Sequence, residues 1–166
     1  MNSTRAALLV ALLIAAPATA HAQAAEREMT EDARAARATV EKLFDAMRAG
    51  DTTALRATFT PGAVLMSVAE GGKIDTTTVD AFVRSVGGAQ TRQPPVVLDE
   101  RLYNVEVRVD GPLATVWTEY DFYAGPRFSH CGVDAVQLAK TAEGWRIFHL
   151  ADTRQREGCP RPVTPR

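Results

Sequence analysis

The side chains best suited to move a proton in this sequence are His149 and Asp134, which fall in two neighbouring predicted strands. If the hairpin between these strands turns at residues 143–144, Leu138 pairs with His149 and Asp134 pairs with Thr153. The histidine and the aspartate then share one face of the sheet, about four residues apart at roughly 3.3 Å per residue, so a ligand or a water could bridge them. A shift of one residue in the pairing would place them on opposite faces.

Two interpretations of this pair stay open. In the first, His149 is a base or a ligand donor, and Asp134 orients either the imidazole or the substrate. In the second, His149 is a core imidazole that bonds a neighbouring backbone carbonyl and takes part in no chemistry.

Further polar and aromatic side chains on the predicted strands could contact a ligand: Trp117, Glu119, Tyr120, His130 and Arg154. Arg154 could bind a carboxylate or a phosphate through its guanidinium, or it could form an ion pair with Asp134, Asp152 or Glu157. Trp117 and Tyr120 could stack on an aromatic ligand, or they could fill the core or a dimer interface. Glu119 shares a face of the sheet with Trp117. This face either lines a polar pocket or faces the solvent. His130 could flank the pocket mouth or lie at the surface.

The residue spacing supports neither a cofactor nor a metal. The sequence has no Ser/His/Asp nucleophile motif, no glycine-rich phosphate loop and no His-x-x-x-His metal spacing. The two cysteines, Cys131 and Cys159, are predicted to form a disulfide if the chain is exported. Two free buried thiols are the alternative.

The first 22 residues have the three parts of a secretory signal peptide: a basic residue, Arg5, an apolar run from Ala6 to Ala16, and a small-residue cleavage site. We predict cleavage after Ala22, with cleavage after Ala20 or Ala24 as close alternatives. The apolar run is about a dozen residues long, shorter than the roughly 20 that a bilayer span requires, so an uncleaved anchor helix is less favoured. The protein is thus predicted to be periplasmic or secreted, with no membrane span after cleavage.

The rest of the chain predicts one domain, residues 30–156, between a mobile leader at 23–29 and a tail at 157–166. The sequence has 19 Lys and Arg against 20 Asp and Glu, and the signal peptide contains one Arg and no acid, so the mature net charge is −2. A nearly neutral chain offers no basic surface to nucleic acid or to an anionic membrane. We expect neither as a partner.

Hydrophobic periodicity predicts three helices and a set of strands. An amphipathic helix begins at the N-cap Thr30 and ends at Gly50, a short helix follows Asp51, and a third helix runs from 76 to 86. A strand at 63–69 and a return strand near Ile74 separate the second helix from the third. Four longer strands follow, at 102–109, 113–123, 129–140 and 145–154, and the first of these places Tyr103 on the same face as Val105, Val107 and Val109.

This order of elements predicts an α+β fold. Three helices must cover one face of a strongly curved, mainly antiparallel sheet, because the strands are too few to close into a barrel. The result is a cone with an apolar pocket between the helices and the sheet.

Three short motifs follow one another as they do in a known family: LFDAMRAGD at 43–51, FTPGAV at 59–64 and GWRIFHL at 144–150. Through these motifs the chain resembles the nuclear transport factor 2 (NTF2)-like superfamily, SnoaL-like branch. The resemblance implies a cone-shaped, cystatin-like fold with a ligand pocket. It also implies a homodimer formed through the exposed face of the sheet.

The resemblance does not include the catalytic residues of the ketosteroid isomerases in this superfamily. Leu43 and Ser67 occupy the positions of their catalytic tyrosine and aspartate. A leucine has no donor, and a serine hydroxyl without an activating base is a poor proton acceptor near neutral pH. Steroid-isomerase chemistry is therefore disfavoured.

The sequence thus predicts an exported small-molecule-binding domain whose ligand is a small hydrophobic or aromatic molecule. One alternative is a cofactor-free enzyme, a dehydratase, isomerase or hydrolase, that uses His149 with Asp134. Another is a protein-interaction module whose cone is filled by side chains.

Overall fold

The computed structural model of this chain describes residues 29–159. The predicted signal peptide, its cleavage site and the last part of the tail lie outside the described residues. Within 29–159, no helix is both long enough and apolar enough to cross a membrane.

Three α-helices form where the sequence supplies caps. Helix α2 spans Glu31–Ala49, and the hydroxyl of Thr30 caps it by accepting a hydrogen bond from a backbone N–H of the first turn at 3.1 Å. The helix ends at Gly50, whose φ of 69° is the left-handed conformation that glycine adopts readily. Helix α3 spans Thr52–Arg56 and helix α4 spans Val79–Gln90, each with a polar side chain at its N-cap.

Six strands form one sheet in the order β2-β1-β6-β5-β4-β3. Neighbouring strands are antiparallel except for β1 and β6, which are parallel. The predicted α+β class with a mainly antiparallel sheet is therefore confirmed. The strands are β1 (Phe59–Val68), β2 (Ile74–Thr78), β3 (Leu98–Asp110), β4 (Leu113–Ala124), β5 (Arg127–Thr141) and β6 (Gly144–Thr153), and a short 3-10 helix, Glu70–Gly72, joins β1 to β2.

Some predicted boundaries are wrong. Helix α4 continues through Gly87 and Gly88 to Gln90, because neither glycine takes the positive φ that would close the helix. Strand β1 begins at Phe59, four residues before its predicted start, and β3 likewise begins at Leu98.

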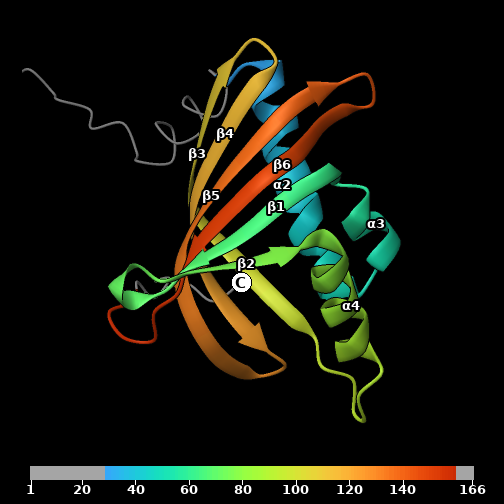
Figure 1. Ribbon diagram of the computed structural model, residues 1–166, viewed down its shortest axis with the longest axis vertical. Coiled ribbons are helices and arrows are strands. Elements are labelled where there is room, and N and C mark those ends of the chain that lie inside the picture. The colour runs from blue at the N-terminus through green and yellow to red at the C-terminus, as the bar shows by residue number, and fades with distance from the viewer. Residues whose placement is uncertain (1–28, 160–166) are drawn as a thin grey trace, which may run out of the picture.

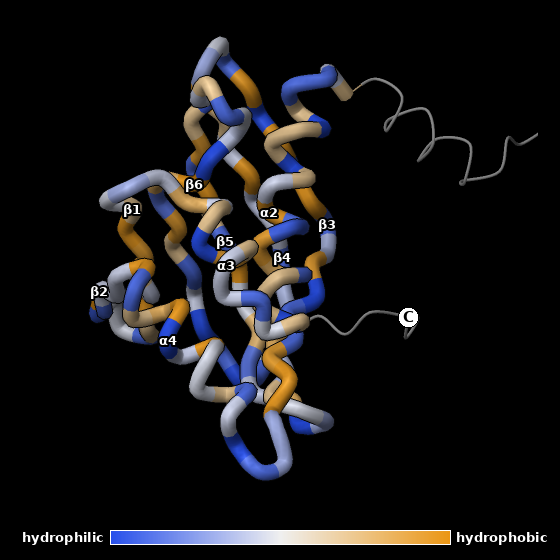
Figure 2. Tube along the Cα trace, turned by 90° about the vertical axis from the view of Figure 1, so that its right-hand side faces the viewer, coloured by the Kyte–Doolittle hydropathy of each residue, from blue (hydrophilic) through white to orange (hydrophobic). Residues whose placement is uncertain are grey.

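The helices lie together on one side of a strongly curved sheet, with α2 behind β5 and β6 and with α3 and α4 beside β1 and β2 (Figure 1). Apolar segments alternate with polar ones along α2 and the strands (Figure 2). The buried core lies between the two layers and includes Val40 and Leu43 of α2 with Val136, Leu138 and Ile147 of the sheet. The helices thus cover the inner face of the sheet.

A bulge in β3 reverses the predicted orientation of Tyr103. Tyr103 pairs with Glu119, but the next pair along the ladder is Glu106 with Trp117, so β3 contains one extra residue here. Asn104, within this interval, has a φ of 48°. Because side chains alternate along a strand, the extra residue places Tyr103 on the face opposite to Val105 and Val107.

The end of β6 approaches β5 so closely that only glycine fits at residue 132. The backbone N–H of Val133 donates to the side-chain hydroxyl of Thr153 at 3.1 Å. A Cβ added to Gly132 would lie 1.8 Å from the carbonyl oxygen of Thr153. Gly132 therefore allows the two strands to bring Asp134 and the residues around Thr153 together.

We predict that Gly132→Ala destabilises the fold, because a backbone oxygen occupies the space that the new methyl group needs. The free energy of unfolding, measured by urea denaturation, should fall by about 3 kcal/mol. The matched control is Gly88→Ala, a helical site where an added Cβ has no atom within 4 Å. That control should gain about 0.5–1 kcal/mol, and equal effects of the two changes would contradict the close approach.

Candidate functional site

A cavity of about 410 Å³ lies between the helices and the inner face of the sheet, where the predicted cone has its pocket. Helices α2 and α4 and all the strands except β4 contribute to its lining. One wall is apolar and consists of Leu43, Phe44, Leu65, Phe82 and Leu150. These side chains continue the buried core outward to the cavity surface.

The opposite end of the cavity is polar. Glu100 of β3, Asp134 of β5 and Asp152 of β6 line it, together with Arg154 directly after β6. Asp134 and Asp152 are direct partners in the antiparallel pair of β5 and β6, so both side chains project from the same face. Glu100 and Asp134 form a side-chain hydrogen bond with one another, although β4 separates their strands.

The carboxylate of Asp152 is satisfied by its neighbours. The hydroxyl of Tyr120 lies 3.2 Å from Asp152 Oδ2 and 2.8 Å from the carbonyl oxygen of Thr153, and it can donate to either. Arg154 Nε donates to the same Oδ2 at 2.6 Å. Burial, and then the charge of Asp152, raise the pKa of Tyr120 above its ordinary value, so the phenol keeps its proton and acts as a donor.

Asp134 presents the acceptor that the chain leaves without a partner. Asp134 is only 2% exposed, and no N–H or hydroxyl group of residues 29–159 donates a hydrogen bond to its Oδ2. Burial raises the pKa of Asp134 to about 7, and the charge of Asp152 acts in the same direction. Burial, and then the charge of Asp134, raise the pKa of Glu100 well above its usual range. Their hydrogen bond raises the pKa of Glu100 and lowers that of Asp134, so Glu100 is the member of the pair that holds the shared proton and donates it to Asp134.

His149 does not face this cavity. Leu138 pairs with Ile147 whereas Gln137 pairs with His149, so β6 has an extra residue between these positions. The predicted register is therefore wrong, and Asp134 lies opposite Asp152 instead of Thr153. Because side chains alternate along β6, Asp152 faces the cavity and His149 faces the other side of the sheet. The structure thus brings Asp134 to Glu100 and not to His149.

The other predicted ligand contacts divide between the two faces. Arg154 lines the cavity, and Tyr120 supports it through Asp152. Trp117 and Glu119 lie on the outer face, where Trp117 is 53% exposed and Glu119 accepts a hydrogen bond from an asparagine amide at 2.9 Å.

His130 lies beside the cavity. Its ring is 5.0 Å from that of Phe122, and both residues line a neighbouring hollow of about 1040 Å³ that shares Arg154 with the cavity. Burial lowers the pKa of His130, and the charge of Arg154 acts in the same direction.

Glu100 is the site residue that sequence reasoning missed. The predicted strand begins at Leu102, whereas β3 begins at Leu98. An extension to Leu98 would have placed Glu100 on the same face as these two leucines, because all three occupy alternate positions. The sequence suggests Asp152 only as a possible ion-pair partner of Arg154. In the structure Asp152 does pair with Arg154, and it also lines the cavity.

The two positions that correspond to the isomerase residues, Leu43 and Ser67, do line the cavity. Neither supplies an acid or a base, as expected. Across residues 29–159, no group of three or more His, Cys, Asp or Glu side chains could hold a metal ion.

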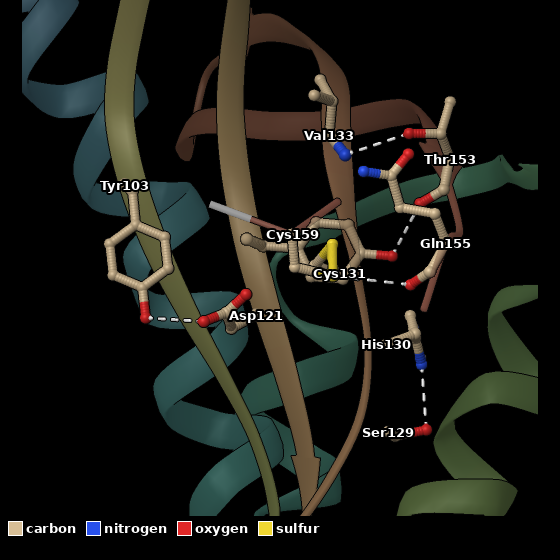
Figure 3. Close-up of a disulfide and its surroundings, with 10 residues drawn as sticks. Tyr103, Asp121, Ser129, His130, Cys131, Val133, Thr153, Gln155 and Cys159 are labelled. Atoms are coloured by element: carbon tan, nitrogen blue, oxygen red, sulfur yellow. Dashed lines mark hydrogen bonds between the residues drawn. A yellow bond between two sulfur atoms is a disulfide. The ribbon is translucent and has the colours of Figure 1, made fainter. Parts of the chain in front are cut away.

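The predicted disulfide is confirmed. Cys131 and Cys159 are joined, with a Cα–Cα distance of 5.8 Å. The backbones of Cys131 and Gln155 also exchange two hydrogen bonds of 2.9 Å, which Figure 3 shows beside the disulfide. These contacts hold the segment after β6, which includes Arg154, against β5.

Comparisons with known proteins agree with this architecture. A sequence profile of the family described as "Putative lumazine-binding" matches residues 31–149. A solved structure described as a "putative dehydratase from the NTF2-like family" of Streptomyces avermitilis is 18% identical, with a TM-score of 0.58 over 75% of this chain and 96% of the other. No match was found among curated proteins.

Two further solved structures have the same fold. An NTF2-like protein with a cystatin-like fold from Novosphingobium aromaticivorans is 17% identical, with a TM-score of 0.60 over 82% of this chain and 90% of the other. An NTF2-like protein of unknown function from Silicibacter pomeroyi is 26% identical, with a TM-score of 0.59 over 76% of this chain and all of the other. The predicted NTF2-like superfamily and cystatin-like fold are therefore confirmed, and the SnoaL-like branch stays a prediction.

We predict that the stability of the fold decreases as the pH rises from about 4 to about 7. Over this window folded Asp134 keeps its proton longer than the unfolded chain does, so the folded state binds more protons. The free energy of unfolding should fall by up to about 1.4 kcal/mol per pH unit from this carboxyl.

Urea denaturation at a series of pH values measures this slope. Asp134→Asn removes the titrating group and should flatten the profile, although Glu100 still contributes. The control is Asp45→Asn at a side chain that is 72% exposed, and it should keep the wild-type slope. Identical slopes for the wild type and Asp134→Asn would show that Asp134 titrates normally in the folded state.

We also predict that Cys159→Ser lowers the free energy of unfolding by about 3–4 kcal/mol, because the disulfide closes a loop between residues 28 apart. Urea denaturation with and without a reductant provides the internal control. The reductant should destabilise the wild type and leave the variant unchanged. A wild type that is insensitive to complete reduction would contradict the structural role of the disulfide.

Proposed function

We propose that this chain, which belongs to the family described as "Putative lumazine-binding", is an exported domain that binds a small molecule in the cavity between its helices and its sheet. The observation that carries the proposal is the contrast between the two ends of that cavity. One wall is apolar, and the other end holds the unpartnered, buried Oδ2 of Asp134.

The size and the chemistry of the cavity both favour a ligand. Its volume of about 410 Å³ lies within the range of about 300–1,000 Å³ that is usual for small-molecule sites, which are mostly apolar with a few polar groups that orient the ligand. A buried polar atom without a hydrogen bond costs about 1–3 kcal/mol, and a ligand that bonds Asp134 Oδ2 would recover that cost. A cavity of this size also argues against an interaction module with a filled cone.

Export is part of the proposal. The signal-peptide pattern at residues 1–22 supports it, and the disulfide between Cys131 and Cys159 is compatible with an oxidising compartment. A homodimer through the outer face of the sheet is also proposed, because the exposed ring of Trp117 offers apolar area there.

A second candidate function is a cofactor-free dehydratase or isomerase. The observation that favours it is the hydrogen-bonded pair of Glu100 and Asp134, because one carboxyl can donate a proton near neutral pH while the other accepts one. His149 faces away, so this pair would replace the predicted pair of His149 and Asp134. Turnover that disappears in Asp134→Asn while ligand affinity persists would favour the enzyme.

We predict that the protein purified from its export compartment carries a ligand that a tryptophan in the cavity excludes. A native mass spectrum, compared with a denatured one, should show added mass on the wild type. Ala81→Trp, from the cavity-lining face of α4, should lose that mass, whereas Ala35→Trp, at an exposed position of α2, should retain it.

Lumazine serves as a second probe in the same test, since the family is named for it. Its fluorescence should respond to the wild type and to Ala35→Trp, with affinity at least about tenfold weaker for Ala81→Trp. No added mass and no response to lumazine would contradict the proposed binding function.

A further inference from the structure

We propose that Asp134 Oδ2, with Glu100 as its internal hydrogen-bond donor, binds the cationic nitrogen of the ligand. The ligand is then a compact apolar or aromatic molecule with one basic head group, an amine or an amidine. The inference rests on the proposed function, because it assigns the chemistry of the ligand to the same cavity.

The hydrogen bonding of the carboxyl pair shows which kind of group a ligand must present to it. Two carboxyl groups can share a hydrogen bond only when one of them carries a proton. In the bond between Glu100 and Asp134 that proton lies between the two side chains. The lone pairs that remain on the carboxyl oxygens of the pair, those of the buried Asp134 Oδ2 among them, can therefore only accept hydrogen bonds. The ligand must bring a donor.

The charges around the cavity are the second argument. Residues of α2, α4 and β1 contribute no charged side chain to the lining. Arg154 contacts Asp152 at 2.6 Å, and the charges of both also act on Glu100 and Asp134. Asp75 of β2 lies at the rim, is 62% exposed and pairs with Lys73 at 2.8 Å. The pair of Glu100 and Asp134, with one proton between them, is left with one buried negative charge.

The buried end of the cavity then carries two negative charges against the single positive charge of Arg154, and this net negative charge selects strongly among ligands. An anionic head group is repelled, and a neutral N–H donor satisfies the oxygen but leaves the charge unbalanced. A cationic nitrogen donates a hydrogen bond to the oxygen and also balances the negative charge. Hydrogen bonds between ionised partners are about twice as strong as neutral ones. The chemistry of the pair therefore favours an ammonium or an amidinium.

The apolar wall defines the rest of the molecule. Leu43, Phe44, Phe82 and Leu150 face the cavity away from the carboxyl pair and offer no hydrogen bond. They suit an aromatic ring or a short hydrocarbon body attached to the head group. The volume of about 410 Å³ limits the ligand to a small molecule.

The pair also makes binding depend on pH. Burial holds the pKa of Asp134 near 7, so as the pH falls below about 7 Asp134 takes up a proton and its negative charge disappears. The affinity for a cation should rise as the pH increases toward about 8 and then level off. The affinity for a neutral ligand of the same shape should change little.

Three probes of nearly the same shape test the inference: benzamidine, a cation with N–H donors; benzamide, which is neutral; and benzoate, an anion. Isothermal titration calorimetry with the mature, oxidised wild-type protein near pH 8 should give the order benzamidine, benzamide, benzoate from tightest to weakest. We expect benzamidine to bind at least about tenfold more tightly than benzamide, as befits one charged hydrogen bond. At pH 5.5 this advantage should shrink to about threefold or less, because Asp134 is then neutral.

Two isosteric variants locate the effect. Asp134→Asn should abolish the preference for benzamidine, whereas Asp75→Asn, which removes the same charge from the exposed rim, should retain it. If Asp134→Asn does not fold, the order of the three probes on the wild type still decides the question. Benzamidine that binds no better than benzamide, or a preference that Asp75→Asn removes, would overturn the inference.

The outcomes also separate this inference from the proposed function. If Ala81→Trp displaces a co-purified ligand but benzamidine has no advantage, the cavity is a binding site and its cation preference is wrong. If all three probes fail to bind and no ligand co-purifies, the proposed function and the inference fall together.

Discussion

The structure depends on one constraint: two carboxyl groups, Glu100 and Asp134, are held side by side at the buried, polar end of a cone whose other wall is apolar. Two neighbouring carboxyl groups that are buried away from water cannot both ionise without a large cost in free energy. They therefore share a proton. Their contact is unfavourable for the stability of the fold above neutral pH, and the rest of the domain must offset it. A cost of this kind at a cavity wall is typical of a group that serves a ligand.

The surroundings of the pair keep it in place. Asp152, the direct partner of Asp134 across β5 and β6, receives a hydrogen bond from Arg154 and lies within hydrogen-bond distance of the Tyr120 hydroxyl. The close approach at Gly132 and the disulfide after β6 fix the segment that carries Arg154. The helices complete the arrangement by supplying the apolar wall that raises the pKa values of the pair.

Much of this fold follows from local patterns in the sequence. The cap at Thr30, the glycine at residue 50 and the alternation of the long strands correspond to the structure because each depends on neighbouring residues alone. The disulfide follows from the presence of two cysteines in a chain predicted to be exported. The candidate site depends on register, which local patterns do not determine. One extra residue in β6 turns His149 away from the cavity, and the early start of β3 brings Glu100 into it. The alternation of Leu98, Glu100 and Leu102 is the one local signal for the second feature, and the extra residue in β6 leaves no turn residue that periodicity could detect.

The same limit applies to the ligand. The sequence contains a carboxylate at position 134, but only the fold places a second carboxyl against it and leaves one of its oxygens without a partner. The most direct test is an NMR titration of the side-chain carboxyl carbons of Glu100 and Asp134 in the folded protein. The account predicts that Asp134 titrates near pH 7 and that the pKa of Glu100 lies well above its usual range. If both carboxyls ionise below about pH 5, as exposed acids do, the pair does not share a proton and the account is contradicted.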